Sequence, residues 1–246
     1  MKILVCISKV PDTTTKISFT DNNTRFNTDK VQWIINPYDE WYALVRALEL
    51  KEAIGGSVTV INVGPADNEQ IIRKALAIGA DDAVRINLDP QDSYIAAVQV
   101  AEYAKGQGYD MILLGKETID YNESAMGGMV AEMLDLPFVS YVSKLDIDGK
   151  TAKMTREIEG GKEIVEVETP FVASAQKGMA EARIPSMRGI MSARTKPINV
   201  VEPVAADELT NIARYELPPP KGNVKYIEPE NAGQLIDLLH NEAKVI

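Results

Sequence analysis

The chain alternates short apolar runs with segments of helical periodicity through its first two thirds, and this alternation restricts the fold more than any other feature. Runs rich in Val, Ile and Leu that end in turn residues predict strands over residues 2–7, 57–63, 82–87 and 110–115. Helical spacing of apolar residues predicts helices over residues 38–54, 68–80, 93–108 and 125–134. Strands and helices that alternate in this way form right-handed crossovers. We therefore expect an α/β fold with a doubly wound, mostly parallel, Rossmann-like sheet.

The pattern changes after residue 137, where strand follows strand. Apolar runs over residues 138–147, 150–158, 162–169 and 171–175 are separated by glycine-containing turns, which predicts antiparallel strands added to the sheet. An insertion over residues 16–27 reads as a β-hairpin with its turn at 21–24. Prolines gather between residues 176 and 234, where periodicity is lost, and apolar helical spacing returns at 233–244. The sequence thus predicts an α/β domain over residues 1–200 and an extended arm over 201–246 that docks on a partner subunit.

Composition excludes several classes of function. A net charge of −10 excludes nucleic acid as a general partner, and no apolar run approaches the length of a membrane span. Cys6 and His240 are the only cysteine and histidine, so we expect no catalytic triad, no catalytic residue and no metal site. We expect Cys6 to be a buried apolar residue and His240 to lie on the polar face of a terminal helix. The first residues lack the features of a signal peptide, which predicts a cytoplasmic protein.

Chemistry is expected at the loops that follow the strands. The first strand is not followed by the glycines of a dinucleotide fingerprint, and no P-loop is present, which argues against nicotinamide-linked dehydrogenases and NTPases. Four loops follow strands, at residues 8–12, 64–67, 88–92 and 115–128, and the last is the richest. Gly127 and Gly128 open a helix there, so a phosphate could approach backbone N–H groups at the positive helix end. The alternative is a glycine-bearing loop that merely packs closely.

A family resemblance emerges when the segments are read in order. The chain contains, in this order, KILVCISKVPD, WIINPYDEWYALVRALELKE, VINVGPADNEQIIRKALAIGADDAVRI, MILLGKETID and ARIPSMRGIMSARTKPI. This series resembles the β-subunit of electron transfer flavoprotein over nearly the whole chain, and the Arg-x-Pro stretch before Ile190 is its most distinctive part. The shared order and spacing of the segments make coincidence an insufficient explanation.

The resemblance implies an electron-carrier subunit and not an enzyme. Such a subunit works with a larger α-subunit that holds most of an FAD, accepts electrons from dehydrogenases and passes them to a downstream redox acceptor. It also implies an adenine nucleotide at the strand-end crevice of this subunit, either AMP or, in electron-bifurcating members, a second FAD. The fold is accordingly expected to be of the adenine-nucleotide-binding type.

The resemblance also implies which residues surround the nucleotide. By position they are Cys6, Asn36, Val63, Asp120, Asn122, Glu123, Ser124, Ala125, Met126, Gly127 and Gly128. The chain reads Ser-Ala-Met-Gly where AMP-type members commonly read Asn-Gln-Thr-Gly and bifurcating members Thr-Ala-Gln-Val-Gly. It keeps the glycine but not the glutamine, so the choice between AMP and FAD stays open. Thr13 stands where animal-type members place an aromatic residue beside the α-subunit flavin.

Met187 falls at the position of the family's apolar anchor for partner dehydrogenases. Methionine adapts to differently shaped pockets, which suits a residue that meets several partners. We expect Met187 to lie in mid-loop after Pro185, with Arg183 and Arg188 placed to orient an acidic partner surface. Neighbouring Ile184 and Met191 could serve in the same way, and internal packing of Met187 is the alternative.

A second reading from another functional class uses the same fold. It is a free-standing adenine-nucleotide-binding protein of the stress type, or a nucleotide enzyme. A pyrophosphatase-type enzyme would carry Ser-Gly-Gly-x-x-Ser after the first strand, where this chain has Ser-Lys-Val-Pro at residues 8–11. The stress-protein reading leaves the proline-rich arm without a purpose.

Overall fold

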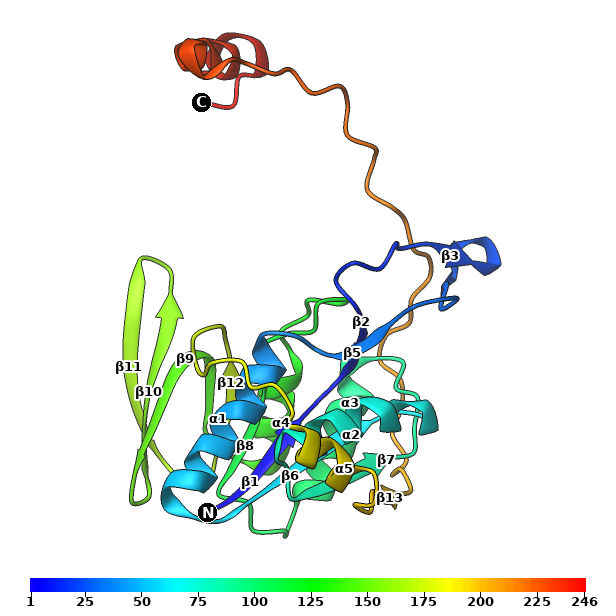
Figure 1. The fold of residues 1–246 in the computed structure, drawn as a ribbon, viewed down its shortest axis with the longest axis vertical. Helices are drawn as coiled ribbons and strands as arrows, with labels where there is room; N and C mark the ends of the chain where they lie inside the picture. Colours follow the sequence, from blue (N-terminus) through cyan, green and yellow to red (C-terminus); the bar gives the residue numbers. More distant parts are fainter. The chain divides into compact units, whose positions relative to one another are not determined.

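A computed structural model describes all residues, 1–246. The chain forms two compact units, and each is described by itself. The first unit comprises Met1–Ile17 and Thr28–Ile212, and the second comprises Ser18–Asn27 and Ala213–Ile246. Figure 1 shows the α/β body of the first unit, in which helices lie along a twisted sheet. No helix of the chain combines the length and the apolar character that a membrane crossing requires.

A nine-stranded sheet forms the centre of the first unit, in the order β11-β10-β9-β12-β8-β1-β6-β7-β13. Strands β1 (Lys2–Cys6), β6 (Ser57–Val63), β7 (Asp82–Ile86), β8 (Met111–Gly115), β12 (Phe171–Ala175) and β13 (Asn199–Val201) pair in parallel. Strand β9 (Phe138–Asp148) pairs in parallel with β12 and continues into an antiparallel meander with β10 (Thr151–Ile158) and β11 (Gly161–Glu168). The predicted α/β fold with a mostly parallel sheet and added antiparallel strands is confirmed.

Four helices cover the two faces of this sheet. Alternate residues of a strand face opposite sides, so Ile3 and Val5 of β1 enter one apolar cluster while Leu4 and Cys6 enter the other. Helices α1 (Asp39–Ile54) and α2 (Glu69–Ile78) bury their apolar residues in the first cluster. Helices α3 (Ser93–Ala104) and α4 (Met126–Leu134) bury theirs in the second. The sheet is therefore doubly wound, as the alternation of segments predicts.

Two short elements occur where the sequence predicts no regular structure. Helix α5 (Met187–Ala193) begins after Ser186, whose Oγ accepts a hydrogen bond from the Gly189 N–H at 3.1 Å. A Cβ at Gly189 would lie 2.2 Å from the carbonyl oxygen of Ala77 on α2, so α5 approaches α2 so closely that only glycine fits at this position. Strand β13 adds three residues to the edge of β7. Elements this short carry too few residues to show periodicity.

The segment from residue 199 to 212 belongs to the first unit and is held against α3. Gln99 of α3 forms two hydrogen bonds with Val204, donating to its carbonyl and accepting from its N–H, both at 2.8 Å. The carboxylate of Asp92, the N-cap of α3, accepts from the N–H groups of Leu209 and Thr210 at 2.7 and 3.0 Å. These bonds hold the start of the C-terminal segment against α3.

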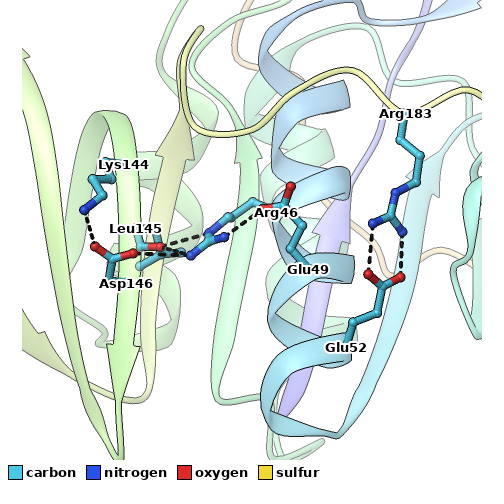
Figure 2. A network of polar contacts seen from close by, with 7 residues as sticks. All are labelled: Arg46, Glu49, Glu52, Lys144, Leu145, Asp146 and Arg183. Carbon is cyan, nitrogen blue, oxygen red and sulfur yellow. Dashed lines mark hydrogen bonds and ion pairs between the residues drawn. The ribbon is translucent and has the colours of Figure 1, made fainter.

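Polar side chains tie α1 to its surroundings (Figure 2). Arg46 donates from Nε and Nη2 to the carbonyl oxygen of Leu145 on β9, at 2.9 and 2.6 Å, and from Nη1 to Glu49 at 2.7 Å. Arg183 forms a two-pronged ion pair with Glu52 near the end of α1, at 2.6 and 2.9 Å. The helix is thereby linked to the meander on one side and to the segment before α5 on the other.

The remaining short elements complete the two units. In the first unit β2 (Lys9–Pro11) pairs with β5 (Trp33–Ile35), and a 3₁₀ turn, Ala66–Asn68, leads into α2. In the second unit β3 (Phe19–Thr20) and β4 (Arg25–Phe26) form the predicted hairpin around a 3₁₀ turn, Asp21–Asn23. The terminal helix that the apolar spacing predicts consists of three consecutive elements. These are a 3₁₀ turn (Pro229–Asn231), α6 (Ala232–Asp237) and a π-helical turn (Leu238–Ala243).

Candidate functional site

The candidate site lies at the carboxyl ends of β1 and β8, where the strand order reverses. From β1 the chain moves to β6 and β7 on one side, and it later returns to β8 and β12 on the other. Adjacent crossovers leave a crevice at such a point in doubly wound sheets, and ligands bind there. The loops that follow β1, β6 and β8 lie at this end of the sheet and would bound such a crevice, so the predicted strand-end residues meet at one end of the sheet.

Cys6, Val63 and Met126 form an apolar floor beside α4. Cys6 is 5% exposed within the second apolar cluster, and Val63 and Met126 pack against that cluster. Burial, with a contribution from the nearby Glu40, raises the pKa of the Cys6 thiol far above its ordinary value. The thiol therefore stays neutral and contributes an apolar surface, as the sequence predicts.

Asn36 is fully buried and holds two of the strand-end loops together. Its backbone N–H donates to the carbonyl of Ser8 at 3.1 Å. Its side-chain amide donates to the Glu117 carbonyl at 2.8 Å and accepts from the Ile119 N–H at 3.0 Å. Both ends of the amide are thus engaged by protein backbone. The geometry makes Asn36 a positioning residue that fixes the start of the loop after β8.

The N-terminus of α4 offers hydrogen-bond donors. No side chain caps this helix at Ala125, and its first turn contains no acidic residue. The leading N–H groups of a helix have no partner within the helix, and the helix dipole makes them attractive to anions. These donors adjoin the apolar floor, since Met126 begins the helix. The donor set fits a phosphate group.

Gly127 and Gly128 differ in what surrounds them. A Cβ at Gly127 would lie 2.7 and 2.8 Å from ring atoms of Phe138 and 3.3 Å from Leu114, whereas a Cβ at Gly128 would lie 3.8 Å from the same ring. Contact at 2.7 Å is not tolerated, so the absence of a side chain at Gly127 lets α4 pack against β9. The structure gives Gly127 a packing function in addition to any effect on a ligand.

The loop before α4 presents carboxylates. Asp120, Asn122 and Glu123 are exposed, and Asn122 and Ser124 adopt left-handed φ angles of 53° and 55°. Ser124 Oγ donates to Glu117 at 3.1 Å, which ties the loop back to its first turn. Carboxylates at the end of a nucleotide site typically accept hydrogen bonds from ribose hydroxyls. The loop therefore places exposed carboxylates just before the uncapped N-terminus of α4.

Sequence reasoning missed a pair of buried carboxyl groups, Asp39 and Glu40. They open α1 and are 8% and 4% exposed. Glu40 accepts hydrogen bonds from the N–H and the hydroxyl of Ser8, at 2.5 and 2.7 Å, and a Cβ at Gly115 would stand 2.8 Å from Glu40 Cγ. Burial raises the pKa of Glu40 to about 8 and that of Asp39 to about 6. Two acidic residues directly after Asn-Pro-Tyr at a strand-end loop were the available signal.

Met187 is exposed on α5 and not buried. It is the first residue of that helix and is 75% exposed, which rules out internal packing and corrects the predicted mid-loop position. Ile184 and Met191 are also exposed, at 87% and 67%. Arg183 is engaged by Glu52, so of the two flanking arginines only Arg188 remains exposed to orient a partner.

A separate hollow of about 500 Å³ adjoins the meander. Its lining contains none of the predicted site residues. It consists of Arg46, Ser143, Lys144, Asp146, Thr155, Glu157, Lys162, Lys177, Gly178 and Met179. Arg46 and Asp146 pair within it, which links α1 to β9.

Known proteins similar to this chain define its family. Residues 24–206 match the family model described as "Electron transfer flavoprotein domain". The protein named "Electron transfer flavoprotein subunit beta" from Bacillus subtilis (strain 168) is 38% identical, with 100% of each chain covered. Proteins of the same name from Syntrophomonas wolfei and Homo sapiens are 36% and 33% identical. The match to the Syntrophomonas wolfei protein covers 100% of this chain and 98% of that protein, and the match to the Homo sapiens protein covers 82% of each.

The doubly wound body with its mostly parallel sheet defines an α/β protein. Within that class, the chain belongs to the electron transfer flavoprotein family, in its β-subunit branch. Its members are named as electron transfer flavoproteins.

Proposed function

We propose that this chain is the β-subunit of a heterodimeric electron transfer flavoprotein that carries an adenine nucleotide in the crevice between β1, β6 and β8. The uncapped N-terminus of α4 beside the apolar floor supports this proposal most directly. Backbone N–H groups of α4 would receive the phosphate, while Cys6 and Val63 would underlie the base. Asp120 and Glu123 would accept hydrogen bonds from the ribose. The nucleotide is AMP, or a second FAD if the complex bifurcates electrons.

The α-subunit is the proposed partner, and it would hold most of the redox-active FAD. That FAD supplies the one- and two-electron chemistry when bound, whereas this chain helps to bind the FAD, to orient it and to shield it from solvent. Residues 213–246 form the arm in this proposal, because the residues before them belong to the first unit. Leu217, Tyr226 and Ile236 are 58%, 89% and 60% exposed on that arm, and a surface of the α-subunit would cover them.

Dehydrogenases are the proposed electron donors, and Met187 is their proposed contact. Its position at the exposed start of α5 supports this assignment. The helix itself is anchored on α2, because Arg73 donates to the Ala193 carbonyl at 2.6 Å. A flexible methionine on a fixed helix suits recognition of several partners. A downstream redox acceptor would then receive the electrons.

Co-expression with the cognate α-subunit tests the proposal. A yellow complex of one copy of each subunit that a dehydrogenase reduces would support it. A colourless protein that stays monomeric or homodimeric beside the α-subunit would contradict it, and would favour a free-standing nucleotide-binding protein.

A further inference from the structure

The β3–β4 hairpin of the second unit has an unusual and well-supported turn. Asp21, Asn22 and Asn23 have consecutive left-handed φ angles of 52°, 57° and 66°, which Asp and Asn tolerate better than other residues with a Cβ. Thr24 Oγ1 donates to the Asp21 carbonyl at 2.7 Å. At the base of the hairpin, the Asn27 N–H donates to the Ser18 carbonyl at 2.9 Å. The turn therefore holds its carbonyl groups in a fixed arrangement.

Tyr215 of the C-terminal arm binds this hairpin in two ways. Its ring stacks on Phe19, with ring centroids 4.9 Å apart and planes 12° from parallel. Its backbone N–H donates to the carbonyl of Asn23, within the left-handed turn, at 2.7 Å. Among residues 207–226, Tyr215 alone is not exposed. Tyr215 thus joins the hairpin through its ring and its backbone, whereas the residues around it are exposed.

The place of this contact along the arm is informative. Leu217 and three successive prolines, 218–220, follow Tyr215 closely. Prolines in series favour an extended, stiff chain, so fixing Tyr215 also restricts the direction in which the next residues leave. Exposed apolar side chains come after this point, including Val224 at 66% and Tyr226 at 89%. The contact therefore lies immediately before the part of the arm that needs a partner.

We infer that the β3–β4 hairpin is a clasp for the arm and forms, with Tyr215, part of the surface that binds the α-subunit. This inference rests on the proposed docking of the arm on the α-subunit. The clasp orders the start of the arm before association, and this lowers the conformational entropy lost on binding. It also explains the insertion between β2 and β5, which adds nothing to the nine-stranded sheet.

A double-mutant cycle on the full-length complex tests the clasp. Phe19→Ala and Tyr215→Ala should each weaken α-subunit binding by about two- to tenfold, the range expected for loss of one aromatic stack. The affinity of the double variant for the α-subunit should be no lower than that of the more impaired single variant, because both substitutions remove the same stacking contact. Phe19→Tyr should restore binding. Hydrogen exchange of the Tyr215 amide in the complex should quicken in Phe19→Ala.

Matched variants separate this inference from the docking proposal. Tyr226→Ala lies on the arm but outside the clasp, so its fold-loss in α-subunit affinity should multiply with that of Phe19→Ala. Deletion of residues 213–246 should lower the affinity further than any single variant, and unchanged affinity there would overturn both the docking and the clasp. If the deletion weakens binding but Phe19→Ala does not, or if the effects of Phe19→Ala and Tyr215→Ala multiply, the clasp is wrong and the docking stands.

Discussion

Both carboxylate oxygens of Glu40 accept hydrogen bonds from Ser8, one from its N–H at 2.5 Å and one from its hydroxyl at 2.7 Å. The pair joins the first turn of α1 to the loop that follows β1. Gly115 of β8 leaves room for Glu40, since any side chain there would overlap it. Three segments thus meet at one buried carboxyl group at the crevice edge. Burial raises the pKa of Glu40 to about 8, although the hydrogen bonds from Ser8 lower it, so the site holds a carboxyl group that titrates near neutral pH.

The raised pKa of Glu40 predicts how stability depends on pH. The folded chain holds a proton at a pKa of about 8, whereas an ordinary glutamate releases it at 4.5. Folding therefore binds a proton between these values, and the free energy of unfolding falls as pH rises through this window. Asp39 contributes in the same direction only up to about pH 6. Glu40→Gln, which does not titrate, should flatten the dependence of the melting temperature between pH 6 and 8. An unchanged slope in this variant would refute the assignment.

Removing the Asn36 side chain should destabilise the protein and loosen the loop after β8. Asn36→Ala leaves the Ile119 N–H and the Glu117 carbonyl without partners in a partly buried place. Each unsatisfied group costs about 1–3 kcal/mol, so urea unfolding should show a loss of several kcal/mol at most. Gln107→Ala, which shortens an exposed side chain, serves as the control. Equal stability of the two variants would contradict the positioning role.

The two adjacent glycines of α4 should respond oppositely to substitution. Gly127→Val would drive a side chain into Phe138 and should destabilise the protein by about 1–3 kcal/mol through overpacking. Gly128→Ala has room and should be neutral or stabilising by about 0.5–1 kcal/mol, because alanine favours helix. Thermal unfolding measures both. Loss of nucleotide in Gly127→Val would therefore not identify a ligand contact, and a similar result for both variants would contradict the packing argument.

Local patterns predicted most of the fold. The strand expected over residues 57–63 is β6 with the same bounds, and the glycine-containing turns marked the meander after residue 137. Periodicity failed for α5 and β13, because seven and three residues are too few to show it. Those elements form through long-range contacts, such as the close approach of Gly189 to Ala77.

The candidate site was less predictable for the same reason. Position along the chain suggested Asn36 and Gly127, but their surroundings depend on segments about 80 and 11 residues away, at Glu117 and Phe138. The burial of Glu40 depends on Ser8 and Gly115 together. No local sequence pattern encodes such contacts between residues that are distant in the sequence. A sequence can therefore indicate which loops line the crevice but not which side chains face a ligand.

Truncating Met187 should impair electron transfer from a dehydrogenase without affecting the flavin. Met187→Ala removes an exposed apolar side chain from a transient interface, where a central contact is worth about 1–4 kcal/mol, or roughly tenfold or more in coupling. Rates at subsaturating carrier measure the effect. Met191→Ala is the matched control, since it is the same residue type on the same helix. If Met191→Ala is equally impaired, or if direct chemical reduction also slows in Met187→Ala, Met187 is not the anchor.

Nucleotide content of the purified complex tests the central proposal most directly. Ala125→Asp places a carboxylate at the start of α4, where the helix dipole favours its charge and that charge would repel a phosphate, whereas Ala125→Asn has a side chain of similar size without the charge. Acid extraction followed by mass spectrometry should find about one adenine nucleotide, besides the α-subunit FAD, in the wild-type and Ala125→Asn complexes. It should find much less in Ala125→Asp, at undiminished thermal stability. Equal nucleotide in all three complexes, or none in the wild type, would contradict the account.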